Sequence, residues 1–196
     1  PDEGEILLNG VDIRKFKMDE YSRLFSVVFQ DFVLFPYMLA QNVAVDVDYD
    51  RELVRKCLTD AGFGEKLQEW EKGETTYLNK EFDDNGVEIS GGEGQKIAIA
   101  RSVYKDAPFI LLDEPTAALD PLAEYEIYSN FDRIVGTKTA IYISHRLSSC
   151  RFCERIAVFH EGRLVQYGSH EELVADTRGK YYEMWHAQAS YYQTKK

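Results

Sequence analysis

Short, uninterrupted apolar runs alternate along this chain with segments in which apolar residues recur at helical spacing. Residues 26–29, 109–112 and 139–143 are such runs. The run over 109–112 predicts a strand buried on both faces, as inner strands of a parallel sheet are, and the other two runs predict further strands, with the one over 139–143 also buried. Helical spacing predicts helices over 51–61 and 96–104, and a short helix is expected around 65–71. Strands that alternate with helices are typical of an α/β fold.

Local signals place the remaining elements. Asn9-Gly10 between apolar residues predicts a hairpin over 5–13, and Glu161-Gly162 predicts a closing hairpin. Ser169 with Glu172 three positions later is a capping box that starts a helix. Pro suits the first position of a helix, so a further helix is expected over 121–134. We also expect a short helix over 19–25, loop and weak strand over 73–87, and a tail helix over 180–193 whose aromatic residues pack on the domain (Tyr181, Tyr182, Trp185, Tyr191 and Tyr192).

Composition narrows the possible partners. The 196 residues suffice for one domain, and 44% hydrophobic and 29% charged residues are ordinary values for a globular chain. The net charge of −11 argues against nucleic acid as a partner and against adhesion to an anionic membrane by charge alone. No apolar run approaches the roughly 20 residues that a membrane-spanning helix requires.

The cysteine pattern invites a metal or redox interpretation that the rest of the sequence does not support. Cys150 and Cys153 have C-x-x-C spacing, but no second cysteine pair or suitably spaced histidine pair completes a zinc site. With Cys57 the total is three, which is no disulfide framework. We therefore expect Cys153 to pack as a small apolar residue and Cys150 to be incidental.

Two carboxylates mark the end of the apolar run 109–112. Asp113 and Glu114 come directly before Pro115, which has no N–H to extend a strand ladder. Open α/β sheets bind ligands at this end of their strands. One carboxylate can hold a hard cation such as Mg²⁺ while the other faces water or substrate. The alternative is a strand that ends in a solvated acidic turn.

A glycine-rich turn precedes the helix predicted over 96–104. Ser90 is a suitable N-cap, and Gly91, Gly92 and Gly94 let backbone N–H groups approach an anion. The helix dipole would add to this, so the turn is a candidate phosphate site. The alternative is a flexible turn that merely starts a helix.

Taken together, these stretches resemble the motifs of ABC-type ATPases, in the family's order. Residues 89–95 resemble the signature loop and residues 110–116 the Walker B strand with its catalytic glutamate. Residues 117–120 are similar to the D-loop, residues 144–146 to the switch-histidine loop, and Gln30 to the glutamine of the Q-loop. The resemblance implies a P-loop NTPase-like α/β fold with a RecA-like, mostly parallel sheet. It also implies a small helical subdomain over about 38–104 that carries the signature loop.

The resemblance implies roles at one ATP site. Asp113 would hold Mg²⁺, and Glu114 would be the general base or orient the attacking water. His145 would contact the γ-phosphate, and Gln30 would coordinate Mg²⁺ or the water. A histidine satisfied within the core is the alternative for His145.

Further roles follow from the head-to-tail dimers in which family members sandwich nucleotide. Ser90, Gly91 and Gly92 would grip ATP bound by a second ATPase domain, and Asp120 would lie at the dimer interface. Glu93 replaces the glutamine that is commonest at its place in the signature, and an acid beside polyphosphate is unfavourable. We therefore assign Glu93 to the signature-like loop without a direct contact to nucleotide.

The family's phosphate-binding loop, of form G-x-x-x-x-G-K-[ST] (Walker A), occurs nowhere in these residues. We therefore expect an N-terminally truncated ATPase domain that is inactive alone, although the full-length protein is an ATPase. The strand over 109–112 would then be left at a sheet edge, which favours non-native oligomers.

The subfamily and its partners follow from other segments. Residues 144–149 and 168–173 resemble exporters whose membrane domain is fused before the ATPase, and the tail resembles bacterial members. Residues 31–39 are rich in large apolar residues and would dock on that transmembrane domain, at the cytoplasmic face of the cell membrane. The resemblance thus implies ATP-driven export of a drug, lipid or peptide. The alternatives are a soluble ABC-type ATPase acting on ribosomes or DNA, or a catalytically inactive fragment.

Overall fold

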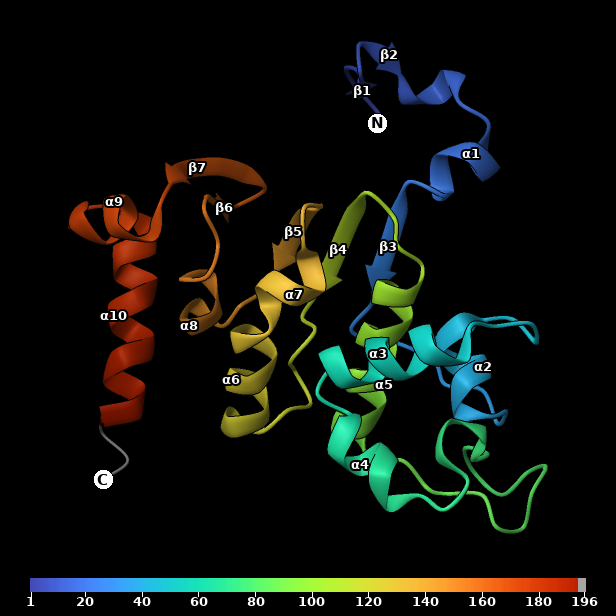
Figure 1. Ribbon diagram of the computed structural model, residues 1–196. Helices are drawn as coiled ribbons and strands as arrows, with labels where there is room; N and C mark the ends of the chain where they lie inside the picture. Colours follow the sequence, from blue (N-terminus) through green and yellow to red (C-terminus); the bar gives the residue numbers. More distant parts are fainter. Residues whose placement is uncertain (194–196) are drawn as a thin grey trace. The chain divides into compact units, whose positions relative to one another are not determined.

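The structure is a computed structural model that describes the backbone of residues 1–193. It also describes their side chains except those of Pro121, Glu126, Asp132 and 189–193. The chain forms two compact units, Pro1–Ile141 and the part from Tyr142 onward, which are described separately (Figure 1).

The first unit begins with the predicted hairpin. Strands β1 (Leu7–Leu8) and β2 (Val11–Asp12) are antiparallel. Asn9 and Gly10 form the turn with φ of 51° and 79°, the left-handed conformation that asparagine and glycine adopt most readily. A 3₁₀ turn (η1, Ile13–Lys15) and a helix shorter than predicted (α1, Met18–Ser22) lead into the sheet.

The central sheet has three strands in the order β3-β4-β5 (Phe25–Val28, Phe109–Asp113 and Thr139–Ile143). β3 and β4 are parallel, with Val28 opposite Leu112. The expectation that 109–112 would be an edge strand is wrong, because β4 lies in the middle and β3 and β5 flank it (Figure 1).

One face of the central sheet is more deeply buried than the other. Ile110 and Leu112 of β4 are buried, whereas Phe109 and Leu111 are half-buried, so burial on both faces was predicted too strongly. Ile141 of β5 is 49% exposed, although a buried strand was predicted there. An outer strand has fewer neighbours to cover its side chains, which is why its apolar run overstated its burial.

Four helices pack together in the first unit. α2 (Leu39–Ala44) and α3 (Arg51–Asp60) pack on α5 (Gly91–Tyr104), and α4 (Gly64–Glu69) packs on α3. The helices predicted over 51–61 and 65–71 are confirmed within two residues at each end, whereas α5 begins five residues before the predicted 96–104, because the glycines expected to form a turn lie in its first turns. The fully buried carboxylate of Glu74, in the 3₁₀ turn η2 (Gly73–Thr75), pairs with Arg51 and Arg55. The core side chains of this part include Leu39, Val54, Leu58, Phe63, Leu78, Ile97 and Ile99.

The helix predicted over 121–134 is two helices, α6 (Pro121–Ser129) and α7 (Phe131–Val135). Asn130 interrupts them, and its carbonyl accepts from the N–H groups of Arg133 and Ile134. Apolar periodicity continues across the interruption, so the sequence pattern did not reveal it.

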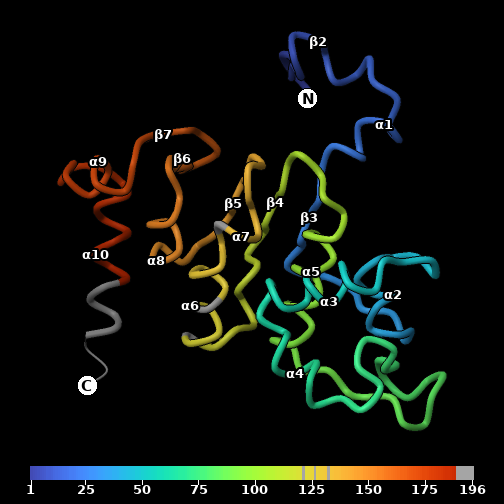
Figure 2. The backbone as a smooth tube through the Cα atoms, in the orientation of Figure 1, coloured from blue at the N-terminus to red at the C-terminus, as the bar shows by residue number. Residues whose placement is uncertain are grey.

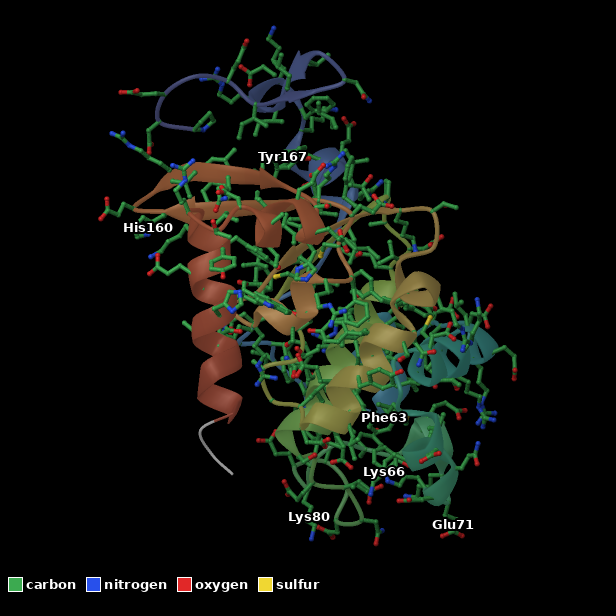
Figure 3. All side chains as sticks on the ribbon, turned by 90° about the vertical axis from the view of Figure 1, so that its left-hand side faces the viewer. Phe63, Lys66, Glu71, Lys80, His160 and Tyr167 are labelled. Carbon is green, nitrogen blue, oxygen red and sulfur yellow. The ribbon has the colours of Figure 1, made fainter. Side chains whose placement is uncertain are left out.

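The second unit contains the closing hairpin and the tail helix. After α8 (Leu147–Cys150), β6 (Ile156–His160) and β7 (Arg163–Gly168) pair antiparallel, with His160 and Tyr167 on the two strands (Figure 3). α9 (His170–Ala175) starts at the predicted Ser169–Glu172 capping box, and α10 (Lys180–Gln193) is the predicted tail helix. The side chains of Tyr191 and Tyr192 lie outside the described residues.

The core of this unit contains the C-x-x-C segment. The expectation that Cys150 is incidental is wrong, because Cys150 is buried in the cluster of Leu147, Leu173 and Tyr181, whereas Cys153 is partly buried against the same cluster. Burial raises the pKa of the Cys150 thiol to about 11. Among the described residues, no three histidine, cysteine or acidic side chains are grouped to bind a metal. Nor does any described helix combine the length and apolarity needed to span a membrane.

Candidate nucleotide site

The end of β4 holds the two carboxylates in different backbone settings. Asp113 is the last residue of the strand, and Glu114 follows it with φ of 47°. This left-handed conformation costs a non-glycine residue roughly 1–2 kcal/mol, so other contacts must maintain it. Both side chains are half-buried. The chain reaches this point directly from α5 through β4 (Figure 2).

Gln95 of α5 supplies such contacts from within the core. Its side chain is 1% exposed, its Nε2 donates to the carbonyl of Glu114 at 3.0 Å, and its Oε1 accepts from the N–H of Ala118 at 3.0 Å. One amide therefore fixes the backbone on both sides of Pro115. Sequence reasoning missed this residue, although a glutamine at a core-facing position of an apolar helix was the available signal.

A second polar cluster fixes the chain just beyond Pro115. The hydroxyl groups of Thr116 and Tyr128 lie 3.0 Å apart, and both contact Glu124 Oε1, at 3.2 and 3.1 Å. Thr116 and Tyr128 are buried. The exit of β4 is thus tied to α6 as well as to α5.

Gln30 lies at the same edge of the sheet as the two carboxylates. β3 and β4 are parallel with Val28 opposite Leu112, so the residues that follow each strand emerge at one edge. The Gln30 side chain is exposed there. The sequence-predicted residues Gln30, Asp113 and Glu114 therefore share the carboxyl edge where α/β sheets bind ligands.

The glycine-rich turn forms a capping box at the start of α5. Ser90 Oγ accepts from the N–H of Glu93 at 3.3 Å, and Glu93 Oε2 accepts from the N–H of Ser90 at 2.9 Å. Lys66 of α4 lies 3.6 Å from the Glu93 carboxylate (Lys66 is labelled in Figure 3). Burial opposes ionisation of Glu93, but the hydrogen bonds from Ser90 and the charge of Lys66 outweigh it and lower its pKa. Glu93 and Ser90 thus cap the start of α5 reciprocally.

The start of α5 packs on the segment that follows β4. A Cβ at Gly92 would lie 3.3 Å from Leu119 Cδ2, and one at Gly91 would lie 3.6 Å from Ala118 Cβ. Next to them, Asp120 Oδ1 accepts from the N–H groups of Leu122 and Ala123 at 2.9 and 3.0 Å. These hydrogen bonds lower the pKa of Asp120. The signature-like and D-loop-like segments are therefore neighbours.

The segment after Gln30 is also held against α5. A Cβ at Gly94 would come within 2.9 Å of the Phe32 ring, so only glycine allows this approach. Arg101 donates to the carbonyls of Asn42 and Val33 at 2.8 and 3.1 Å. The buried Asn42 amide in turn accepts from the N–H of Phe35 at 2.8 Å.

This anchored segment presents apolar side chains to solvent. Val33, Phe35 and Tyr37 are 61%, 45% and 49% exposed. The Tyr37 ring stacks on that of Phe82, which is 63% exposed, with 5.7 Å between centroids. We name the set Val33, Phe35, Tyr37 and Phe82 the aromatic patch.

His145 belongs to the second unit, in the loop between β5 and α8. Its side chain is exposed and its carbonyl accepts from Gln188 Nε2 at 2.6 Å. Within the loop, Ser144 Oγ accepts from the N–H of Arg146 at 2.9 Å. The sequence indicated the position of His145 at the end of a strand but not the contact with α10.

The sequence of this chain is similar to those of ABC transporters. The family model for ABC transporters matches residues 1–117. The ATP-dependent lipid A-core flippase of Methylobacillus flagellatus is 38% identical over 88% of this chain and 29% of its own length. The ABC multidrug transporter MDR5 of Trichophyton rubrum is 34% identical over 96% of this chain and 15% of its own length. This chain therefore spans less than a third of these relatives.

A solved structure gives the same result for the fold. A bacterial Atm1-family ABC exporter with ATP bound superposes with a TM-score of 0.85 at 34% identity, over 95% of this chain and 32% of the exporter chain. The fold is that of an ABC ATPase, and the chain belongs to the ABC transporter family.

Proposed function

We propose that this chain is part of the ATP-hydrolysing domain of an ABC exporter. The observation that carries the proposal is the convergence of Gln30, Asp113 and Glu114 at one sheet edge, with the backbone of Glu114 fixed by Gln95. Catalysis of phosphoryl transfer depends on positioning and charge stabilisation, and fixed oxygen ligands at a strand end provide both.

The oxygen donors at this edge fit Mg²⁺. Asp113 offers a carboxylate and Gln30 an amide oxygen, and Mg²⁺ commonly binds one or two protein carboxylates with phosphates and water completing its shell. Bound there, Mg²⁺ would neutralise charge on the ATP phosphates. Glu114, one residue beyond the strand, would accept a proton from the attacking water or orient it.

His145 would donate a hydrogen bond to the γ-phosphate from the loop that follows β5. The His145 side chain is exposed, so it is accessible to a bound nucleotide, and the hydrogen bond from Gln188 holds its backbone in place. This role remains the proposal that the family motif implies.

The signature-like loop would serve the ATP of a second copy in a head-to-tail dimer. Ser90, Gly91 and Gly92 stand at the N-terminus of the 14-residue α5, where backbone N–H groups and the helix dipole favour phosphate. Glu93 would act through the capping box, because its carboxylate is engaged by Ser90 and Lys66. Asp120 would lie at the dimer interface beside this loop.

The aromatic patch would dock on the transmembrane domain, at the cytoplasmic face of the membrane. Its residues are exposed although Arg101 of α5 holds the Val33 carbonyl and Asn42 of α2 holds the Phe35 N–H, which favours an interface over a loosely packed loop. The helical subdomain over about 38–104 would carry the signature-like loop and Phe82 of this patch, and the other three patch residues would directly precede it. The relatives named above include a lipid A-core flippase and a multidrug transporter, which support a lipid or drug as the exported substrate.

ATP hydrolysis tests the proposal. The protein is produced in a version extended upstream through a G-x-x-x-x-G-K-[ST] loop, as wild type and with Glu114→Gln. We expect phosphate release from the wild type and a loss of at least about 10²-fold in Glu114→Gln, because the general base is gone, while ATP still binds. No hydrolysis by the extended wild type, even with its membrane domain, would refute the proposal and favour an inactive module.

A further inference from the structure

Gln188 of α10 spans the loop that carries His145. Its Nε2 donates to the carbonyl of His145 at 2.6 Å, and its Oε1 accepts from the N–H of Leu147 at 3.0 Å. Both ends of one side-chain amide are thus used, on backbone groups two residues apart. All three residues lie in the second unit.

The hydrogen bond from the Leu147 N–H to Gln188 occupies a backbone donor in the first turn of α8. The first N–H groups of a helix have no partner inside it, and Arg146, the N-cap of α8, makes no capping hydrogen bond with its side chain. Leu147 is the first residue of α8 and is buried. Gln188 therefore caps α8 from a distant part of the chain.

The helix that supplies Gln188 is itself anchored. Tyr181 is 1% exposed, its hydroxyl lies 2.9 Å from His170 Nδ1, and its N–H donates to Gln166 Oε1 at 2.9 Å. The Trp185 ring packs edge-on against His170 at 4.7 Å between centroids. Tyr181, Trp185 and Gln188 are spaced i, i+4 and i+7, so they lie on one face of α10.

We propose that Gln188 is a positioning residue that sets the backbone of His145 for ATP hydrolysis. The inference rests on the proposed function, because it assigns Gln188 to the same reaction. The loop's own hydrogen bonds, among Ser144, Arg146 and Ser149, stabilise its turn. The two hydrogen bonds of Gln188 tie that turn to α10. A displacement of about 1 Å at a reacting group can cost about 10²-fold in rate.

The first test uses the 196-residue chain and needs no turnover. NMR follows hydrogen exchange of the Leu147 N–H and the ring signals of His145 in wild type and Gln188→Leu. Gln166→Leu is the matched control, since it removes a glutamine amide that also holds α10 but does not contact the loop. We expect at least about tenfold faster exchange at Leu147 and shifted His145 signals in Gln188→Leu only. Unchanged exchange and signals would overturn the proposal.

The second test measures ATP hydrolysis in the version extended upstream. We expect Gln188→Leu to lower kcat by about 10–10²-fold with little change in KM for ATP, because positioning acts on the transition state. Gln166→Leu should leave kcat close to wild type. A kcat for Gln188→Leu equal to that of the control would overturn the proposal even if the loop signals move.

A third variant separates positioning from misfolding. In Gln188→Glu the new carboxylate can accept from Leu147 but cannot donate to the His145 carbonyl until it is protonated. Because this carboxylate is ionised near pH 7.5, Gln188→Glu should lower kcat about as much as Gln188→Leu while exchange at Leu147 stays close to wild type. A kcat equal to that of wild type would contradict the proposal. If the extended wild type hydrolyses no ATP, the proposed function fails, and the role of Gln188 in that reaction fails with it, whatever the NMR result.

Discussion

The substitution Gln95→Leu tests whether one buried amide fixes the end of β4. Leucine is close to glutamine in volume and is compatible with a helix, so it introduces neither a large cavity nor a helix-breaking residue. What it removes are the two hydrogen bonds of 3.0 Å to the Glu114 carbonyl and the Ala118 N–H.

The expected loss of stability follows from those two bonds. Each neutral hydrogen bond contributes roughly 0.5–1.5 kcal/mol net, and a backbone group left buried without a partner costs about 1–3 kcal/mol. Because Gln95 is 1% exposed, water does not simply replace it. We expect the free energy of unfolding to fall by about 2–4 kcal/mol.

Urea denaturation followed by circular dichroism measures this change. Gln68→Leu is the matched control, because Gln68 is exposed on α4, and it should change the free energy by less than about 0.5 kcal/mol. A Gln95→Leu variant as stable as this control would refute the reasoning, since the amide would then contribute nothing to the fixed strand end.

Three further predictions concern other parts of the chain. Burial and the nearby Arg151 lower the pKa of His170, so the folded state binds its proton less readily than the unfolded state. The free energy of unfolding should therefore fall as pH drops below about 6.5, and it should fall less in His170→Gln. Urea denaturation at pH 7.5 and 5.5 measures both changes, and an equal fall in wild type and variant would contradict this. Burial raises the pKa of Cys57 and Cys150 to about 11, so both thiols should resist Ellman's reagent at pH 8 until urea unfolds the chain, and rapid labelling would contradict their burial. Glu161 has φ of 49° in the β6–β7 turn, so Glu161→Asn should stabilise the protein by about 0.5–1 kcal/mol, and a lower midpoint in urea would count against this turn geometry.

Features set by neighbouring residues were predictable from the sequence. The turn at Asn9-Gly10 and the capping box of Ser169 with Glu172 depend on residues at most three positions apart, and both are present. The position of Asp113 and Glu114 at a strand end followed from an apolar run and Pro115.

Features set by residues far apart in sequence were not predictable in this way. The central place of β4 depends on pairing with β3 and β5, which no local pattern encodes. The contacts of Gln95 with Glu114 and of Gln188 with His145 join residues 19 and 43 positions apart. A glutamine in a helix looks the same in sequence whether its amide reaches water or a distant backbone.

The measurement that tests the central claim most directly mixes two inactive variants of the extended protein. Glu114→Gln removes the proposed base, and Ser90→Arg blocks the loop proposed to grip the ATP of a second copy; both variants are first checked for folding. In a head-to-tail dimer, a mixed pair has one complete site, formed by Glu114 of one copy and Ser90 of the other. An equal mixture should therefore recover about a quarter of wild-type ATP hydrolysis, because half of the random dimers are mixed and each has one working site of two. A mixture as inactive as its components would contradict an ATP site shared between two copies.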